Sequence, residues 1–209
     1  MAFTIEKFTS LRPYLYHLTY GANLNRIRRE SALVSAATLL RAANDPHRNR
    51  ERRKGAMRVR VDGDTVVIRD QDPLHKGAID FMDGFTFEEL VQFLNGFVFF
   101  WPGTDKGPSE YGKRHFERYA KDDSFVIRVP TAAMLQANQG AALFSKYNSG
   151  APRCSNGKHT PRGKDTFIAA DRADFIASEV VEVVFRAKAG LPSSAQVGKL
   201  TDSINWKKL

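Results

Sequence analysis

The chain has 209 residues, of which 42% are hydrophobic, 26% charged and 11% aromatic. This composition excludes collagen-like, coiled-coil and wholly disordered proteins, and the length predicts one large globular domain. Lys and Arg outnumber Asp and Glu by 32 to 23, which gives a net charge of +9. The single cysteine, Cys154, excludes an internal disulfide and a zinc site built on paired cysteines.

The first half of the chain predicts a strand, two helices and a hairpin. Residues 14–20 form the strand, and apolar residues at helical spacing predict helices over 22–30 and 31–43. The basic segment 47–56 has the composition of an exposed loop. The alternating pattern of 57–61, followed by Asp62-Gly63, predicts a hairpin that returns over 65–68.

The second half contains a helix start with a clear capping signal. Thr86 and Glu89 form a capping box that opens a helix to about Asn95, and a buried strand over 97–101 follows, stopped by Pro102. The remaining patterns predict helices over 109–121 and 131–138 and strands over 125–129, 143–147, 166–168 and 179–185.

The order of these elements favours an α+β fold, because strands and helices alternate irregularly and hairpin signals are present. We expect a single domain over residues 1–190 and a polar, loosely held tail over 191–209. The longest strongly apolar run, 97–101, is far too short to span a membrane, and the N-terminus has no apolar core of signal-peptide length. We therefore expect a cytoplasmic protein with no membrane partner.

The positive charge is concentrated between residues 26 and 60. Eleven basic and three acidic residues lie there, so the segment carries +8 of the net charge. Arginine outnumbers lysine in it, and the planar guanidinium suits phosphate groups. The segment therefore predicts a nucleic-acid partner, with an ordinary solvated basic loop as the alternative. The expected contact residues are Arg48, Arg50, Arg52, Arg53 and Lys54.

The most informative segment is YHLTYGANLNRIRRESAL, residues 16–33. His17 and Thr19 lie two apart in the expected strand and so face the same side, whereas Tyr16 and Leu18 face the other. A helix follows at once, and Asn23 at its start brings a third polar side chain toward the end of the strand. The remaining histidines, at positions 47, 75, 115 and 159, have no metal-ligand spacing, so no metal is expected.

This pattern resembles the start of DarT-type ADP-ribosyltransferases and, more distantly, that of the RNA 2'-phosphotransferases. The resemblance implies an ADP-ribosyltransferase-like fold, with central mixed or antiparallel sheets flanked by helices. It also implies NAD as substrate, with His17, Thr19 and Asn23 at its ribose and amide portions. Arg69, in VVIRDQDPL, matches the family arginine that contacts the NAD phosphates and the acceptor. The strand FVFFWP is similar to the aromatic strand beside the nicotinamide pocket, which implies roles for Phe99 and Trp101.

The chain is also similar, in four ordered segments, to a bacterial DarT-like domain family of unassigned function. These segments are YHLT (16–19), VFFWP (98–102), NSG (148–150) and RGKDTF (162–167). DarT-type enzymes carry a catalytic glutamate just before a late apolar strand, and Asp165 stands at the equivalent place here. Asp165 is therefore the expected carboxylate. Glu179 or Glu182 on the last strand are alternatives, and loss of transfer activity is a third.

The chemistry explains why these residue types matter. Cleavage of the nicotinamide–ribose bond needs a carboxylate beside the developing positive charge, cations on the pyrophosphate and an aromatic wall for the ring. The leading hypothesis is an NAD-dependent ADP-ribosyltransferase that modifies DNA or RNA, and the resemblance implies a bacterial toxin or phage-defence role. A non-catalytic nucleic-acid-binding module and an RNA 2'-phosphotransferase-like enzyme are the alternatives.

Overall fold

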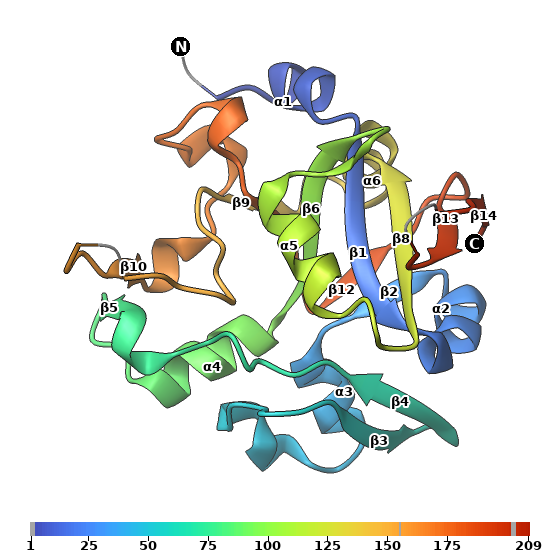
Figure 1. The fold of residues 1–209 in the computed structure, drawn as a ribbon, viewed down its shortest axis with the longest axis horizontal. Helices are drawn as coiled ribbons and strands as arrows, with labels where there is room; N and C mark the ends of the chain where they lie inside the picture. The colour runs from blue at the N-terminus through green and yellow to red at the C-terminus, as the bar shows by residue number, and fades with distance from the viewer. Residues whose placement is uncertain (1–2, 155, 202–203) are drawn as a thin grey trace.

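The computed structural model describes residues 3–154, 156–201 and 204–209. Within these ranges, six α-helices lie among 14 mostly short strands, which confirms the expected α+β class (Figure 1). The helices are α1 (Ile5–Leu11), α2 (Leu24–Glu30), α3 (Ala36–Ala42), α4 (Phe87–Asn95), α5 (Glu110–Arg118) and α6 (Thr131–Ala137).

Eight strands form one central sheet in which each neighbouring pair is antiparallel. The order is β14-β13-β8-β1-β6-β11-β9, with β7 on β6. The strands of this sheet are β1 (Tyr14–Tyr20), β6 (Phe97–Thr104), β7 (Gly107–Pro108), β8 (Ser124–Pro130), β9 (Ala142–Ser145), β11 (Glu182–Arg186), β13 (Gln196–Lys199) and β14 (Lys207–Lys208). Strands that are neighbours in the sheet are therefore often far apart in the sequence.

Three two-stranded ladders surround the central sheet. The hairpin of β3 and β4 and the pair of β2 and β12 are antiparallel, whereas β5 and β10 are parallel. Their bounds are β2 (Ala32–Val34), β3 (Met57–Val61), β4 (Asp64–Ile68), β5 (Ile79–Phe81), β10 (Thr160–Arg162) and β12 (Lys188–Gly190).

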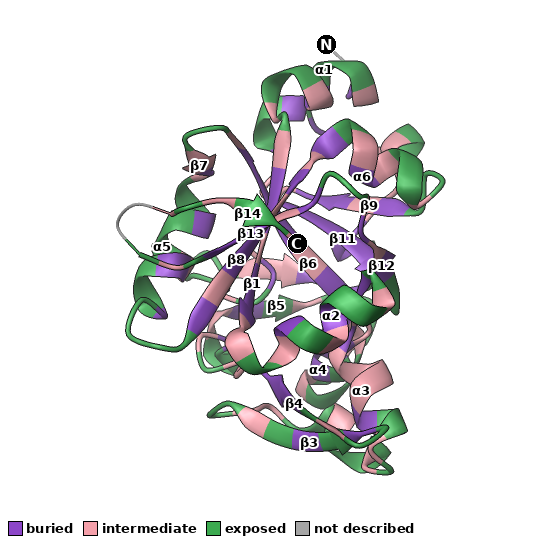
Figure 2. Ribbon diagram, turned by 90° about the vertical axis from the view of Figure 1, so that its right-hand side faces the viewer, coloured by how far each residue is buried: buried purple, intermediate pink, exposed green. Residues whose placement is uncertain are grey.

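Apolar side chains cover both faces of the sheet, so its strands are largely buried while the helices expose their outer sides (Figure 2). The main core packs residues such as Leu15, Phe100 and Ile127 with side chains from α1, α2 and α6. On the other face, Tyr16, Leu18 and Trp101 pack under α5 with Phe116 and Tyr119. The expected alternation of side chains along β1 is thus confirmed.

Several local predictions are also confirmed. The strand over 14–20 has the expected bounds, and the Thr86–Glu89 capping box is complete. The hairpin turns at Asp62 and Gly63, whose φ angles of 52° and 84° are the left-handed pair that a two-residue turn requires. These predictions are correct because each feature depends on only a few adjacent residues.

The predicted helix over 31–43 is wrong in its first part. Ser31 adopts a left-handed conformation, with φ of 46°, which ends α2. Residues 32–34 then form β2, and the hydroxyl of Ser35 accepts a hydrogen bond from the Thr38 amide to start α3. A capping serine therefore separates strand from helix at this point.

Two strand predictions need correction. Pro102 does not stop β6, because its carbonyl accepts from Ser109 on the side away from β1, so the missing N–H costs no bond to that strand. Residues 166–168 are not a strand: a turn occupies 164–166, and Ile168 makes one bridge to Phe144.

The segment after Gly190 is not a loosely held tail. β13 pairs with β8 over four residues, and Val197 is buried in the main core. Residues 202–203 of the predicted tail lie outside the described residues. Sequence polarity is misleading here because β13 is only four residues long and buries Val197 and Gly198 between two polar residues. In the part of the chain that the structure describes, no helix has the length and apolar character that crossing a membrane requires.

Val197→Ala should therefore lower the free energy of unfolding by about 2 kcal/mol, because it removes two buried methyl groups from the core. Urea denaturation measures this loss. Lys199→Ala, at an exposed position of the same strand, is the matched control and should change stability by less than about 0.5 kcal/mol. Equal, negligible effects of both changes would show that β13 is not part of the folded core.

Candidate functional site

The site lies where strands β1 and β6 separate. Their ladder pairs Tyr14 with Gly103 and ends at Tyr16 and Trp101. Beyond that point β1 continues along β8 up to Tyr20, whereas the first half of β6 pairs with β11. The two strands therefore diverge within one sheet, and the space between them becomes a cavity.

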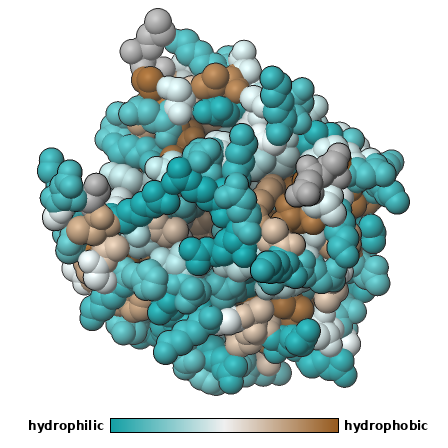
Figure 3. Space-filling view, in the orientation of Figure 1, coloured by the Kyte–Doolittle hydropathy of each residue, from teal (hydrophilic) through white to brown (hydrophobic). Residues whose placement is uncertain are grey.

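This cavity has a volume of about 330 Å³, which is within the range of small-molecule sites. Its walls come from the ends of β1 and β6, the α5 face, the segment after β4 and the loop after β9. In Figure 3 this face of the molecule is mostly hydrophilic, with apolar residues visible in a recess near its centre. The polar and charged residues on its walls include His17, Thr19, Arg53, Arg69, His115, Arg153 and Glu182.

The His17 side chain bonds a backbone group of β6 just beyond the point where the β1–β6 ladder ends. Its Nδ1 lies 2.8 Å from the Phe99 carbonyl oxygen, which can only accept, so Nδ1 carries the proton and donates. Burial lowers the pKa of His17 to about 4, although the bond to Phe99 works in the opposite direction. The imidazole is therefore neutral at pH 7, and its Nε2 is an acceptor.

Thr19 and Asn23 meet at the end of β1, as the sequence predicted. The Asn23 amide donates to the Thr19 hydroxyl over 3.1 Å and to the Val67 carbonyl over 2.9 Å, and it accepts from the Val67 N–H over 2.8 Å. Thr19 keeps its hydroxyl proton for another acceptor. Asn23 is occupied mainly in fixing β4 beside the start of α2.

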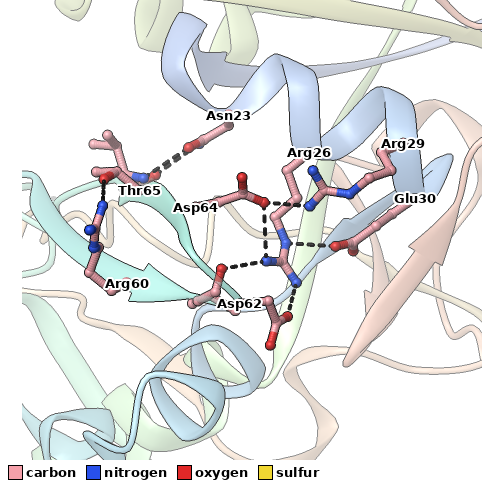
Figure 4. A network of polar contacts seen from close by, with 10 residues as sticks. Asn23, Arg26, Arg29, Glu30, Arg60, Asp62, Asp64 and Thr65 are labelled. Carbon is pink, nitrogen blue, oxygen red and sulfur yellow. Dashed lines mark hydrogen bonds and ion pairs between the residues drawn. The ribbon is translucent and has the colours of Figure 1, made fainter.

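Ion pairs strengthen this attachment of the hairpin (Figure 4). The Arg26 guanidinium contacts Asp62 at 3.0 Å and Asp64 at 3.7 Å, and it pairs with Glu30 on its own helix. Arg29 also pairs with Asp64. These contacts hold the β3–β4 hairpin against α2, where β4 forms one wall of the cavity.

Arg69 lines the cavity but is heavily engaged. Its guanidinium lies between the rings of Tyr20 and Tyr119, 4.3 and 4.2 Å from their centroids. It also donates to Ser124 Oγ over 3.1 Å and contacts Asp122 at 3.4 Å. The side chain is thus a rigid cation whose position is set before any ligand arrives.

Part of the basic segment departs from the predicted exposed loop, because Arg52 and Arg53 are only partly exposed. Arg53 is held inside, where it donates to the Arg69 carbonyl and to Asn95 Oδ1, both at 2.8 Å, and burial lowers its pKa to about 10. Arg52 donates to the Gln71 and Asp72 carbonyls, and Arg48 pairs with Asp45. Arg48, Arg50 and Lys54 are exposed as expected. Arg53 instead adds a second cation to the cavity wall.

Phe99 and Trp101, the two aromatic residues expected at the wall, both line the cavity but differ in exposure. Phe99 lines the cavity and is partly exposed. Trp101 is only 8% exposed, because His115 of α5 covers it with ring centroids 4.3 Å apart. Sequence reasoning missed His115, since a lone histidine on a helix gives no sign that α5 packs over β6. Burial lowers the pKa of His115 to about 3, so it too is neutral at pH 7.

Asp165 is not where the sequence placed the catalytic carboxylate. It sits outside the cavity lining, on the turn over 164–166, where its side chain is 59% exposed and pairs with Arg172 at 3.3 Å. Glu179 is also exposed and caps a short turn by accepting from the Ile176 amide. Of the three acidic candidates, Glu182 alone lines the cavity.

Glu182 is 2% exposed and begins β11, directly before the apolar run Val183-Val184-Phe185. Burial raises the pKa of Glu182 to about 7, while hydrogen bonds from Ser149 and the charge of Arg162 act in the opposite direction. Its position just before a late apolar strand is the signal that singles it out. The structure thus brings together in one cavity two neutral histidines, the buried carboxylate of Glu182 and several arginines, Arg53 and Arg69 among them.

Comparison with known proteins gives one result. Residues 13–194 match the profile of a protein family described as a family of unknown function (DUF7002). The chain belongs to the DUF7002 family. None of the curated proteins matches it, and neither does any solved structure. The segment matched to DUF7002 contains all the cavity residues, from His17 to Glu182, and ends before β13.

The burial of Glu182 should be visible as a pH dependence of stability. The folded chain holds the proton of Glu182 more tightly than the unfolded chain, because its pKa rises from 4.5 to about 7. Glu182 therefore destabilises the fold progressively as pH rises through this window. The free energy of unfolding of Glu182→Gln minus that of the wild type should increase by about 3 kcal/mol between about pH 4.5 and about pH 8.

Urea denaturation of both proteins at several pH values measures this difference. The titrations of His17 and His115 cancel in the subtraction, because both proteins contain them. A difference that does not change with pH would show that Glu182 is not a buried, proton-binding carboxylate.

Proposed function

We propose that this chain is an ADP-ribosyltransferase that takes NAD as its substrate and modifies a nucleic acid. The proposal rests on one observation above all: a buried carboxylate, Glu182, shares a cavity with His17 at the point where two strands of the sheet separate. The resemblance of the segment around His17 to DarT-type enzymes supports the same activity.

The carboxylate suits the bond that must break. Departure of nicotinamide leaves positive charge on the ribose, and an ionised Glu182 beside the ribose would stabilise that charge. The attacking group of the acceptor loses a proton as its new bond to ribose forms. A carboxylate with pKa near 7 is well matched to accept this proton at neutral pH.

The other walls suit the rest of NAD. The free Nε2 of His17 can accept a hydrogen bond from a ribose hydroxyl, and the Thr19 hydroxyl can donate to an amide oxygen. Arg53 and Arg69 supply the positive charge that a pyrophosphate requires. Phe99 offers a partly exposed ring to the nicotinamide.

The buried glutamate also favours this activity over the 2'-phosphotransferase alternative. Phosphate transfer from RNA needs cations around the phosphate and makes no use of a carboxylate beside the ribose. Glu182 would repel a phosphate in such a site when ionised. Release of a 2'-phosphate from RNA by the purified protein would support the alternative instead.

We infer from the exposed part of the basic segment that the molecule receiving ADP-ribose is a nucleic acid. Arg50, Lys54 and Arg58 all point to solvent near the β3–β4 hairpin, which also forms a wall of the cavity. Exposed Lys and Arg side chains bind nucleic-acid phosphates by releasing counterions. These same residues favour the second candidate function, a nucleic-acid-binding module without catalysis.

Incubation with labelled NAD and single-stranded DNA, duplex DNA or RNA tests the activity. We expect label on one nucleic acid. Glu182→Gln should slow its transfer by about a hundredfold or more, because a neutral amide cannot stabilise the cationic ribose. His17→Ala should have a comparable effect through lost positioning.

Asp165→Asn is the matched control for the carboxylate. It removes one acidic group outside the cavity and should leave transfer within about twofold of the wild type. Loss of transfer in Asp165→Asn but not in Glu182→Gln would reverse our assignment. Absence of NAD turnover with every acceptor would refute the proposed activity.

The basic residues predict a salt-dependent affinity. The triple change Arg50→Ala, Lys54→Ala and Arg58→Ala should weaken binding of a single-stranded oligonucleotide and reduce the slope of log affinity against log salt by about 2. Fluorescence anisotropy at several salt concentrations measures both quantities. Tight, salt-dependent binding without NAD turnover would support the non-catalytic module, and an unchanged slope would remove these residues from the interface.

A further inference from the structure

The loop after β9 holds the Glu182 carboxylate by both oxygens. Ser149 is fully buried, and its hydroxyl donates to Glu182 Oε2 over 2.6 Å. The Ser149 backbone N–H donates to Oε1 over 3.2 Å. One residue therefore fixes the rotation of the carboxylate and keeps a charge-stabilising donor on each oxygen.

Arg162 holds this loop in place from behind. It is the largest fully buried side chain, with 1% exposure, and one of its amino groups donates to the Asn148 carbonyl over 2.8 Å. Its guanidinium also covers the Tyr147 ring at 4.8 Å from the centroid. Arg162 thus fixes Tyr147 and Asn148, the two residues that precede Ser149.

The position of Arg162 is itself tightly set by its neighbours. β10, which ends at Arg162, pairs in parallel with β5, and the Gly163 N–H donates to the Thr166 hydroxyl over 3.0 Å. A side chain at position 163 would collide with Met82, whose Cβ would lie 2.8 Å from the added carbon. The motifs NSG and RGKDTF are therefore in contact, because Arg162 donates to the Asn148 carbonyl. The next residue, Ser149, contacts Glu182.

We propose that Ser149 and Arg162 are positioning residues for the Glu182 carboxylate: Ser149 orients and stabilises it directly, and Arg162 fixes the loop that carries Ser149. The proposal rests on Glu182 being the catalytic carboxylate of the proposed function. The proposal also gives a role to the motif RGKDTF (162–167). Asp165 of this motif faces solvent, and the motif acts through its first residue, Arg162.

The effect of Ser149 on the pKa of Glu182 can be measured separately from that of the charged groups around the carboxylate. Arg162 is the cation whose field favours the ionised carboxylate, and His17 and Arg153 line the same cavity. Ser149→Ala leaves these groups unchanged and removes one donor from the carboxylate. The proton of Glu182 should then be held more tightly.

Carbon-13 NMR of protein labelled at the glutamate δ-carbons measures this without any substrate. The Glu182 signal is identified by its loss in Glu182→Gln. Its titration midpoint in Ser149→Ala should lie higher than in the wild type by about one pH unit. An unchanged midpoint in the folded variant would overturn the proposal.

Ser145→Ala is the matched control. Ser145 is 1% exposed and lies directly opposite Glu182 in the β9–β11 ladder, but its hydroxyl accepts from the Tyr147 amide. The control removes an equally buried hydroxyl and should leave the midpoint unchanged. A shift as large as that of Ser149→Ala would show that general loosening of the sheet is responsible. If Ser149→Ala does not fold, Ser149→Cys keeps the shape with a weaker donor and should raise the midpoint in the same direction.

Kinetics with labelled NAD separate this proposal from the proposed function. In Ser149→Ala, kcat should fall about tenfold and its pH profile should move to higher pH, while KM for NAD stays within about twofold. A pH profile like that of the wild type would overturn the positioning role. Absence of turnover in the wild type would refute the transferase activity alone, because the NMR titration tests the contact between Ser149 and Glu182 independently.

Discussion

The divergence of β1 and β6 is the constraint on which the rest of the site depends. An antiparallel ladder normally satisfies every backbone group of adjacent strands, so separating two central strands leaves polar groups that need new partners. The His17 imidazole provides one such partner by donating to the Phe99 carbonyl. The residue that lines the cavity therefore also stabilises the opening that creates it.

Burial acts in opposite directions on the pKa values of two groups of the cavity, His17 and Glu182. It favours the neutral form of each, which lowers the pKa of His17 to about 4 and raises that of Glu182 to about 7. At neutral pH the histidine is an uncharged acceptor, while the glutamate is shared between its two forms. A ligand that brings positive charge near Glu182 would shift it to the carboxylate, and this coupling requires no movement of the chain.

Local sequence patterns predicted the parts of the fold that depend on adjacent residues. The His17 strand, the Thr86 capping box and the Asp62-Gly63 turn are examples, because each is decided by alternation, capping or backbone conformation over a few positions. The chain pattern also placed His17 and Thr19 on one side of β1. The sequence favoured Asp165 over Glu182, whereas only the packing of β11 beside β6 shows that Glu182 is the acid that lines the cavity.

Contacts between segments that are distant in sequence also determined which basic side chains turn inward. Arg53 resembles its neighbours Arg52 and Lys54 in sequence, yet it turns inward because Asn95 at the end of α4 offers it a buried acceptor. His115 and Trp101 meet only after α5 has folded back over β6. No pattern within either segment specifies these contacts, so charge counting overestimated the exposed basic surface.

The attachment of the β3–β4 hairpin has a consequence for one wall of the cavity. The hairpin has its own small apolar cluster with α3, and polar contacts from Asn23, Arg26 and Arg29 fasten it to α2. Ions screen such charge pairs far more strongly than they affect a packed apolar core. Rising ionic strength should therefore weaken the polar attachment of this wall more than the packing of the central sheet, which ties the shape of one side of the cavity to the surrounding electrolyte.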